Sequence, residues 1–216
     1  MINWKIKHEL KNFIEDIENK NVLDFGCGDS RYRTLIEKKN KYTGLDVEKN
    51  GFPRDRKAAD VFWDDKTLPF EDESFDIIIC SEVLQQVKNL SNTINEIRRV
   101  LKQNGKIFAT LVFVHGEHDI PSDFLRFTSF GTKKIFEENK FKIIKFEKML
   151  KGKKCVIQVI ESAFTKYIDE NLNTNFRLFH IFTFKVILLI IKTLFFFLPK
   201  NIFSEIHSGN LIIAQK

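Results

Sequence analysis

The chain has 216 residues, enough for one domain with a single sizeable hydrophobic core. Hydrophobic residues make up 43% and charged residues 30% of it, which is ordinary for a soluble globular protein. The formal net charge of +6 comes from lysines spread along the whole length, which would suit an anionic membrane or an acidic substrate. No RNA-recognition or DNA-binding helix motif is present, so nucleic acid is not an expected partner.

The N-terminus and the cysteines indicate a reducing compartment. Residues 1–20 lack the apolar core of a signal peptide and predict a short amphipathic helix. Cys27, Cys80 and Cys155 lie far apart in no metal-ligand spacing, and two of them fall in apolar, strand-like runs. They are predicted to be buried thiols without a disulfide or a bound metal, and the protein is expected in the cytoplasm.

Between residues 21 and 149, apolar strand-like runs alternate with helix-like stretches. The predicted strands are Val22–Phe25, Tyr42–Val47, Ala58–Val61, Phe75–Ser81, Lys106–Val114 and Phe141–Met149. The predicted helices are Asp29–Lys38, a stretch capped by Ser91 and stopped by Asn104-Gly105, and Gly131–Asn139. This alternation predicts an α/β fold in which helices wrap a mostly parallel sheet.

Glycines and polar residues accompany four of these strands. Gly26-Cys27-Gly28 follows the first strand, Asp46 and Val47 end the second, Asp60 lies at the third, and Ser81-Glu82 ends the fourth. In an open parallel sheet the ligand binds beyond the carboxyl ends of the strands. The coincidence of four such positions at one edge predicts a nucleotide-binding site there.

The residue types indicate which parts of a ligand they could hold. Two glycines let the backbone turn tightly and approach a ligand closely. Asp24 precedes the turn and could meet an ammonium group, and Asp46, about twenty residues on, could accept hydrogen bonds from two ribose hydroxyls. Asp60 could accept a hydrogen bond from an adenine amino group. A plain turn and acidic surface caps are the alternative interpretation.

A dinucleotide site is the main competitor, because it shares the acidic residue after the second strand. The third glycine of the dinucleotide motif is missing, since Asp29, Ser30 and Arg31 follow Gly28. The Asp29 carboxylate would also repel a pyrophosphate. A ligand with an ammonium and a ribose but no phosphate suits the loop better, and S-adenosyl-L-methionine (SAM) is such a ligand.

Four segments together resemble the class I SAM-dependent methyltransferases of the type-11 branch: VLDFGCGDSRY, YTGLDV, AADVFWDDKTLPFEDESFDIIICSEVLQQV and EIRRVLKQNGKIFATLVF. The closing GNLIIAQK resembles the family's last strand. The resemblance implies a Rossmann-like, seven-stranded, mostly parallel sheet with helices on both faces. The chain would then be one methyltransferase domain: a leading helix (1–20), a Rossmann-like core (21–149), a hydrophobic helical insertion (150–209) and the last strand (210–216).

The resemblance also implies roles at the sheet edge. Gly26, Cys27 and Gly28 would line the methionine end of SAM, Asp46 would hold the ribose, and Asp60 with Val61 would border the adenine. The sequence departs from the family pattern at two places. LQQV stands at Leu84–Val87, where many relatives carry an acid–histidine pair, and Arg31 stands where proline is common. The first departure could alter the acceptor side.

HGEHDIPSDFLRFT, residues 115–128, resembles an H-x-x-P-x-D-[aromatic]-x-R-[aromatic]-T segment of one methyltransferase subgroup. That subgroup is often met among enzymes thought to act on surface saccharides or their lipid carriers. His118 could take a proton from a hydroxyl acceptor. Arg126 could pair with Asp123 or hold an anionic group. A loop histidine and a structural Asp123–Arg126 salt bridge are the alternatives.

His115 and Glu82 are further candidates for the base. Methyl transfer could also proceed without a strong base, because holding the acceptor in line with an activated methyl group can supply most of the acceleration.

HIFTFKVILLIIKTLFFFLP, residues 180–199, is nearly long and apolar enough to span a bilayer. Lys185 and Lys192 share one helix face, which is costly inside a bilayer, and a span would leave the last strand on the wrong side. A helix packed on the sheet and a helix in the membrane plane, with lysines toward the headgroups, are the two main interpretations beside a span. The second would place the protein at the inner face of the membrane.

The sequence therefore predicts SAM-dependent methyl transfer to a small or lipid-linked acceptor, with a saccharide or lipid hydroxyl as the expected group. A SAM-binding accessory protein without catalysis is one alternative, because the acid–histidine pair is missing at Gln85-Gln86. A dinucleotide-dependent oxidoreductase is another, disfavoured by the absent third glycine.

Overall fold

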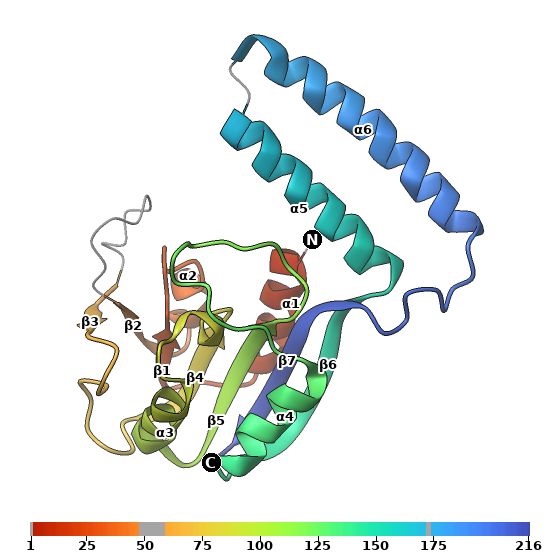
Figure 1. Ribbon diagram of the computed structural model, residues 1–216. Helices are drawn as coiled ribbons and strands as arrows, with labels where there is room; N and C mark the ends of the chain where they lie inside the picture. Colours follow the sequence, from red (N-terminus) through yellow and green to blue (C-terminus); the bar gives the residue numbers. More distant parts are fainter. Residues whose placement is uncertain (1, 48–58, 172–173) are drawn as a thin grey trace.

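The computed structural model describes residues 2–47, 59–171 and 174–216, and within them seven strands form one sheet in the order β3-β2-β1-β4-β5-β7-β6 (Figure 1). The strands are β1 (Asn21–Phe25), β2 (Lys41–Val47), β3 (Val61–Trp63), β4 (Phe75–Ser81), β5 (Leu101–Val112), β6 (Lys142–Lys151) and β7 (His207–Gln215). All neighbouring pairs are parallel except those of β7 with β5 and β6. The predicted Rossmann-like, mostly parallel fold is confirmed.

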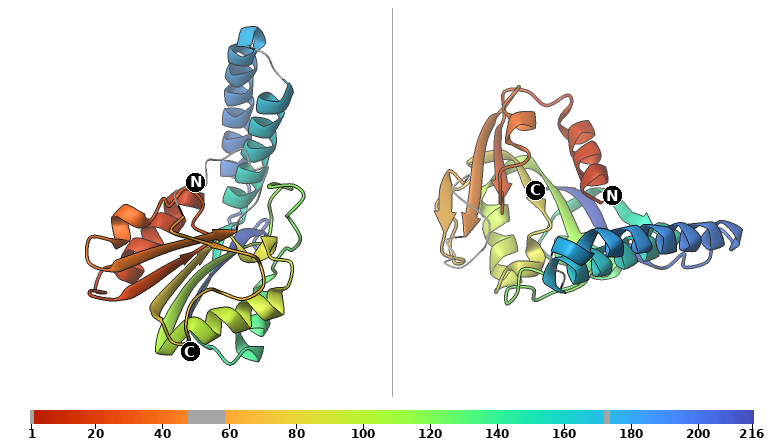
Figure 2. Two further views of the ribbon diagram at one scale, coloured as in Figure 1. Left: turned by 90° about the vertical axis from the view of Figure 1, so that its left-hand side faces the viewer. Right: turned by 90° about the horizontal axis from the view of Figure 1, so that it is seen from above.

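Helices cover both faces of the sheet (Figures 1 and 2). The helices are α1 (Ile2–Ile14), α2 (Arg33–Ile36), α3 (Leu90–Val100), α4 (Ser129–Glu138), α5 (Lys153–Asn171) and α6 (Thr174–Phe197), with a 3-10 turn at Leu84–Gln86, and the first four pack on the sheet. Alternate residues of β4 divide between two cores: Ile77 packs with α1 and α2, whereas Ile78 packs with α3 and α4. This explains the apolar run of β4, since a strand covered on both faces has no solvent side.

The predicted helix Asp29–Lys38 is wrong in extent. Only Arg33–Ile36 are helical, because the residues before them form turns: the Ser30 N–H donates to the Cys27 carbonyl at 2.9 Å. The predicted third strand, Ala58–Val61, is shifted. Its first residue lies outside the described residues, and β3 runs two residues further, to Trp63.

Helix α3 differs from its prediction at both ends. Asn89 caps it instead of Ser91, since the Asn89 side chain accepts a hydrogen bond from the Asn92 N–H at 3.1 Å. The helix ends at Val100, before Asn104-Gly105, because Leu101 is already extended and begins β5.

Helices α5 and α6 form a hairpin that rises from the carboxyl edge of the sheet and returns to β7 (Figure 2). The stretch Phe176–Phe197 is long and apolar enough to cross a bilayer, and 6% of its most apolar window is buried. The interpretation of this tail as a helix buried against the sheet is therefore wrong.

Candidate active site

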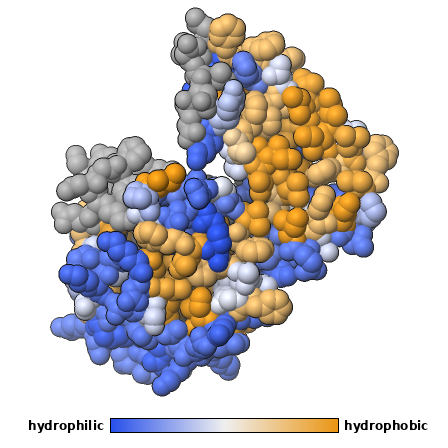
Figure 3. All heavy atoms as spheres, in the orientation of Figure 1, coloured by the Kyte–Doolittle hydropathy of each residue, from blue (hydrophilic) through white to orange (hydrophobic). Residues whose placement is uncertain are grey.

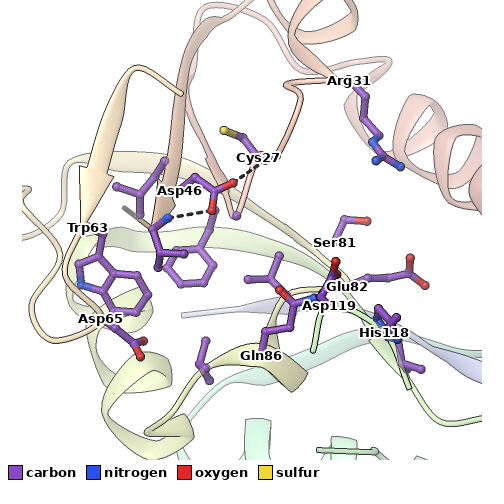
Figure 4. A pocket seen from close by; sticks show the side chains of 18 of the residues that line it. Cys27, Arg31, Asp46, Trp63, Asp65, Ser81, Glu82, Gln86, His118 and Asp119 are labelled. Carbon is purple, nitrogen blue, oxygen red and sulfur yellow. Dashed lines mark hydrogen bonds between the residues drawn. The ribbon is translucent and has the colours of Figure 1, made fainter. Parts of the chain in front are cut away.

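A cleft of about 320 Å³ opens at the carboxyl edge of the sheet, in the size range of small-molecule sites, roughly 300–1,000 Å³ (Figure 4). The ends of β1, β2, β3 and β4 form one side of it, and the loop after β5 forms the other. Predicted residues that line it are Gly26, Cys27, Gly28, Asp46, Val47, Ser81, Glu82, His115 and His118. The edge that the sequence indicated is therefore where the structure has its cleft.

The glycine turn after β1 has the backbone conformation that favours glycine. Gly26 (φ 73°) and Gly28 (φ 57°) both lie in the left-handed region. The N–H groups of Gly26 and Cys27 donate to the Leu45 carbonyl at 2.8 and 3.0 Å, which fastens the turn to β2. A Cβ at Gly26 would lie 2.3 Å from a methyl carbon of Val83, whereas a Cβ at Gly28 would meet no atom within 4 Å. Gly28 thus leaves open space for a ligand beside the backbone.

We predict different effects for an added methyl group at these two glycines. Gly26→Ala should lower the free energy of unfolding by about 2 kcal/mol more than Gly28→Ala, because only the first forces Val83 to move. Both variants place alanine at a positive φ, so the cost of that backbone conformation is common to both and cancels in the comparison. Denaturant titration measures the difference, and equal losses would contradict the Val83 contact as its cause.

Asp46 joins the end of β2 to the glycine turn. Its carboxylate accepts hydrogen bonds from the N–H of Gly28 at 2.8 Å and of Val47 at 2.7 Å (Figure 4). The residue is 6% exposed and lines the cleft. A carboxylate is an acceptor group with two oxygens, which matches the spacing of two neighbouring hydroxyls. Asp46 therefore fits two vicinal hydroxyls of a ribose.

Asp60 and Val61 do not border the cleft that the described residues form. Because β3 begins at Val61, Asp60 precedes the strand and lies away from its carboxyl end. Its carboxylate accepts hydrogen bonds from the Gly44 N–H at 2.7 Å and from Arg33 at 2.8 Å. The structure therefore places Asp60 away from the cleft, although the sequence predicted that it would border an adenine there.

Trp63 and Asp65, which the sequence interpretation missed, occupy the carboxyl end of β3 (Figure 4). Trp63 Nε1 and Asp65 Oδ1 are buried and have no hydrogen-bond partner among the described residues. A buried polar atom without a partner is costly, so a ligand that bonds to it would restore the lost bond. The chemistry of this end fits a heteroaromatic ring with an amino group.

Asp24 lies beneath the glycine turn and outside the cleft lining, so the predicted contact with a ligand's ammonium is not found. It is buried, and it accepts a hydrogen bond from the Tyr42 hydroxyl at 2.8 Å. Burial raises the pKa of Asp24 to about 7, although the Tyr42 bond lowers it. The Asp24 carboxyl group therefore stays protonated to a higher pH in the folded protein than in the unfolded chain.

This pKa shift predicts a pH-dependent gain of stability in Asp24→Asn. The contribution of the Asp24 carboxyl group to the free energy of unfolding should fall as the pH rises from 3.8 to about 7. The reason is that this group loses its proton at a lower pH in the unfolded chain than in the folded protein. The variant cannot ionise and can still accept the Tyr42 bond. At about pH 8 the variant should have a higher Tm than wild type and a free energy of unfolding larger by on the order of 4 kcal/mol, whereas at about pH 4 the two should have similar Tm values. A Tm difference that does not change with pH would contradict the shift.

The other side of the cleft is polar. Gln86 donates to Asp119 at 2.8 Å, which joins the LQQV segment to the loop after β5. Gln85 is buried and donates to the Glu82 carbonyl at 2.6 Å, so the two glutamines that replace the acid–histidine pair support the loops. Burial raises the pKa of Glu82, while His115 and His118 lower it. Glu82 therefore remains a candidate proton acceptor.

His118 is the candidate base that the structure orients best. Its Nδ1 lies 3.1 Å from the Gly116 carbonyl and 3.4 Å from the Asp123 carboxylate. Two acceptors at Nδ1 favour the tautomer that carries its hydrogen there, which leaves the Nε2 lone pair available. His118 lines the cleft and its side chain is 29% exposed.

Asp123 and Arg126 support this histidine from behind the cleft lining. Arg126 donates to both Asp123 oxygens at 2.5 and 2.6 Å, and the Asp123 side chain is 4% exposed. The bidentate bond holds the pKa of Asp123 below its usual range. Neither side chain lines the cleft, so their predicted catalytic role becomes one of positioning the loop.

Cys27 is a lining residue with an unreactive thiol. Burial raises its pKa to about 11. The cleft also contains Arg31 and Tyr32, and the Tyr32 hydroxyl lies 3.2 Å from Ser81 Oγ. The sequence interpretation assigned no contact to either, because both follow the glycine turn in a segment that was expected to be a regular helix.

Comparisons with known proteins place this site in context. Residues 23–109 match the family model described as a methyltransferase domain. An uncharacterized protein of Methanocaldococcus jannaschii is 34% identical over 145 residues, which cover 64% of each chain. A phthiotriol/phenolphthiotriol dimycocerosates methyltransferase of Mycobacterium ulcerans is 31% identical over 104 residues, covering 44% of this chain and 38% of that one. The chain thus spans less than two thirds of the length of these relatives.

The solved structure of phosphoethanolamine N-methyltransferase 2 from Haemonchus contortus, in complex with SAM, shares the fold. It superposes with a TM-score of 0.63 over 98% of this chain and 52% of that one, at 18% sequence identity. The family match covers β1 to β5, the strands that carry Gly26, Gly28 and Asp46. Residues 23–109 are thus similar to a methyltransferase domain, and the chain shares its fold with a methyltransferase whose structure was solved in complex with SAM.

Proposed function

We propose that the protein is a SAM-dependent methyltransferase whose acceptor is a hydroxyl group of a saccharide or a lipid. The observation that carries the proposal is that one cleft has Asp46 on its first side and His118 on its second. Bound SAM supplies an activated methyl group. The chain's own groups would hold the ribose and take up the proton that the acceptor loses.

The cofactor side is assigned from the contacts described above. Asp46 would accept bonds from the ribose hydroxyls, and Gly28 would leave room for the methionine end. Trp63 and Asp65 would border the adenine, since the unpaired Asp65 Oδ1 can accept from its amino group. The adenine role thereby moves from Asp60 to Asp65.

The side chains on the second side of the cleft suit a hydroxyl group as the methyl acceptor. His118 Nε2 can take a proton from a hydroxyl that lies between it and the methyl group, and Glu82 offers a second acceptor nearby. A lipid-linked acceptor is favoured by the relative from Mycobacterium ulcerans, which is named a methyltransferase of phthiotriol and phenolphthiotriol dimycocerosates.

A second candidate function is a SAM-binding accessory protein. It is favoured by Gln85 and Gln86, which support loops through their amide groups where many relatives carry an acid–histidine pair. The two candidates share the cofactor site and differ in whether the methyl group is passed on.

Incubation with methyl-labelled SAM and separate lipid, saccharide and soluble extracts tests the proposal. We expect label in the lipid or saccharide fraction, and none with Asp46→Ala. If no fraction gains label although the protein binds SAM, the accessory role is favoured. Label on protein alone would contradict the proposed acceptor.

A further inference from the structure

We propose that the α5–α6 hairpin docks the protein onto the anionic surface of a lipid bilayer, with the outer face of α6 lying in the interface and a lysine cluster at the hairpin's foot on the headgroups. The proposal concerns where the protein resides. It holds whether or not the cleft methylates a hydroxyl.

The outer face of α6 is a continuous exposed apolar stripe. Phe179, Phe182, Val186, Ile190 and Phe197 recur three, four, four and seven residues apart and are 63%, 67%, 42%, 54% and 79% exposed. Figure 3 shows apolar surface gathered along α6. Soluble proteins rarely expose an apolar patch of this extent unless it binds a partner or a membrane.

The opposite face of α6 is already occupied by α5. Phe184 stacks on Phe164 with ring centroids 3.6 Å apart, Leu188 is buried, and Lys192 pairs with Glu161 at 3.1 Å. The hairpin is therefore held together by its own contacts, and the outer stripe is left for a different partner.

A single span is incompatible with the sheet. Strand β6 leads into α5 and β7 follows α6, and these strands pair side by side, with Met149 opposite Gly209 and Lys151 opposite His207. The chain must leave and return on the same side of a membrane. A re-entrant hairpin would carry Glu161 and Lys166 of α5 into the hydrocarbon, which is costly. An in-plane position avoids both problems.

Lysines gather where the hairpin meets the body. Lys5, Lys148, Lys151, Lys153, Lys154 and Lys200 line one shallow depression together with Trp4, which is 72% exposed. Lys151, Lys154 and Lys200 have no acidic partner among the described residues. A basic patch with an exposed tryptophan beside an apolar helix face is complementary to anionic headgroups above acyl chains.

The hairpin also contacts the loop beside the cleft. Lys166 of α5 donates to the Glu117 carbonyl at 3.2 Å, within the loop that carries His115 and His118 into the cleft. A docked hairpin would therefore hold the cleft mouth close to the lipid surface.

Flotation with lipid vesicles tests the docking. We expect wild-type protein to float with vesicles of phosphatidylcholine and phosphatidylglycerol, and far less with phosphatidylcholine alone. Phe182→Asp/Ile190→Asp should abolish flotation. Phe130→Asp is the matched control, since Phe130 is 82% exposed on α4, and it should float like wild type.

The lysine cluster is tested by Lys151→Gln/Lys154→Gln/Lys200→Gln. We expect roughly tenfold to hundredfold weaker binding to anionic vesicles, and a smaller dependence on salt. Lys88→Gln/Lys134→Gln/Lys140→Gln removes equal charge from other exposed positions and should have little effect.

Four results would overturn the proposal. The first is wild-type protein that does not float, and the second is equal flotation of wild type and Phe182→Asp/Ile190→Asp. The third is a dimer in solution that the same double substitution dissociates, without flotation, since a second copy would then cover the stripe.

The fourth is protein that stays on the vesicles after an alkaline carbonate wash, because that would make the hairpin an integral membrane segment and not an in-plane one. None of these measurements reads methyl transfer, so their failure is distinct from failure of the proposed function.

Discussion

Asp46→Ala is expected to weaken SAM binding by about a hundredfold or more. The carboxylate would accept hydrogen bonds from two ribose hydroxyls, and each bond to a charged group contributes roughly 1.5–3 kcal/mol. The variant also loses the acceptor of the Gly28 N–H, which fixes the glycine turn. Equilibrium dialysis with labelled SAM measures the change.

Asp60→Asn is the matched control for this prediction. Asp60 is also an acid beside β2, but it bonds to Gly44 and Arg33 and lies outside the cleft lining. Its substitution should leave the Kd for SAM within about twofold, since it removes no ligand contact. Equal losses in Asp46→Ala and Asp60→Asn would mean that the ribose is not held at Asp46.

His118→Ala is expected to lower kcat about a hundredfold while leaving the Kd for SAM unchanged. A positioned general base contributes roughly 10²–10⁴-fold to a proton-transfer step. Steady-state kinetics with the acceptor found by labelling measures kcat, and equilibrium dialysis with labelled SAM measures the Kd.

Two further variants separate the roles around this histidine. Asp123→Asn keeps the side-chain shape and weakens the support of His118 Nδ1, so it should lower kcat less than His118→Ala does. His115→Ala should have a small effect, although His115 also lines the cleft. A large loss in His115→Ala with an unchanged His118→Ala would transfer the base role to His115.

The sequence predicts the cofactor edge well because local rules govern it. An apolar run followed by Gly26-Cys27-Gly28 can end a strand in only a few ways, and the second strand ends at Val47, one residue after Asp46, in both prediction and structure. Parallel pairing of β1 with β2 then brings these residues together, since Phe25 lies opposite Leu45.

The third strand shows where local pattern fails. Only Val61–Trp63 are extended, and so short a strand is defined by its pairing with β2, in which Asp46 faces Phe62. The apolar pattern alone placed the end of this strand at Val61 and so selected Asp60 as the residue that borders the adenine. The strand ends two residues later, at Trp63, and the residues at its carboxyl end that line the cleft are Trp63 and Asp65.

The hairpin shows a second limit. An apolar helix buried in a core and one that lies on a membrane have similar compositions, and Phe176–Phe197 fits either. The sheet faces are already filled by α1, α2, α3 and α4, so no core surface remains for α6. Whether a core surface remains for α6 can therefore be decided only from the assembled fold.

Calorimetric titration of the wild-type protein with SAM, S-adenosylhomocysteine and NAD tests the central claim most directly. The account predicts saturable binding of SAM and S-adenosylhomocysteine to one site, because Asp46 is placed to hold the ribose and the turn lacks the third glycine of a dinucleotide site. NAD should not bind. Tight binding of NAD without binding of SAM would contradict the account and would make the cleft a dinucleotide site.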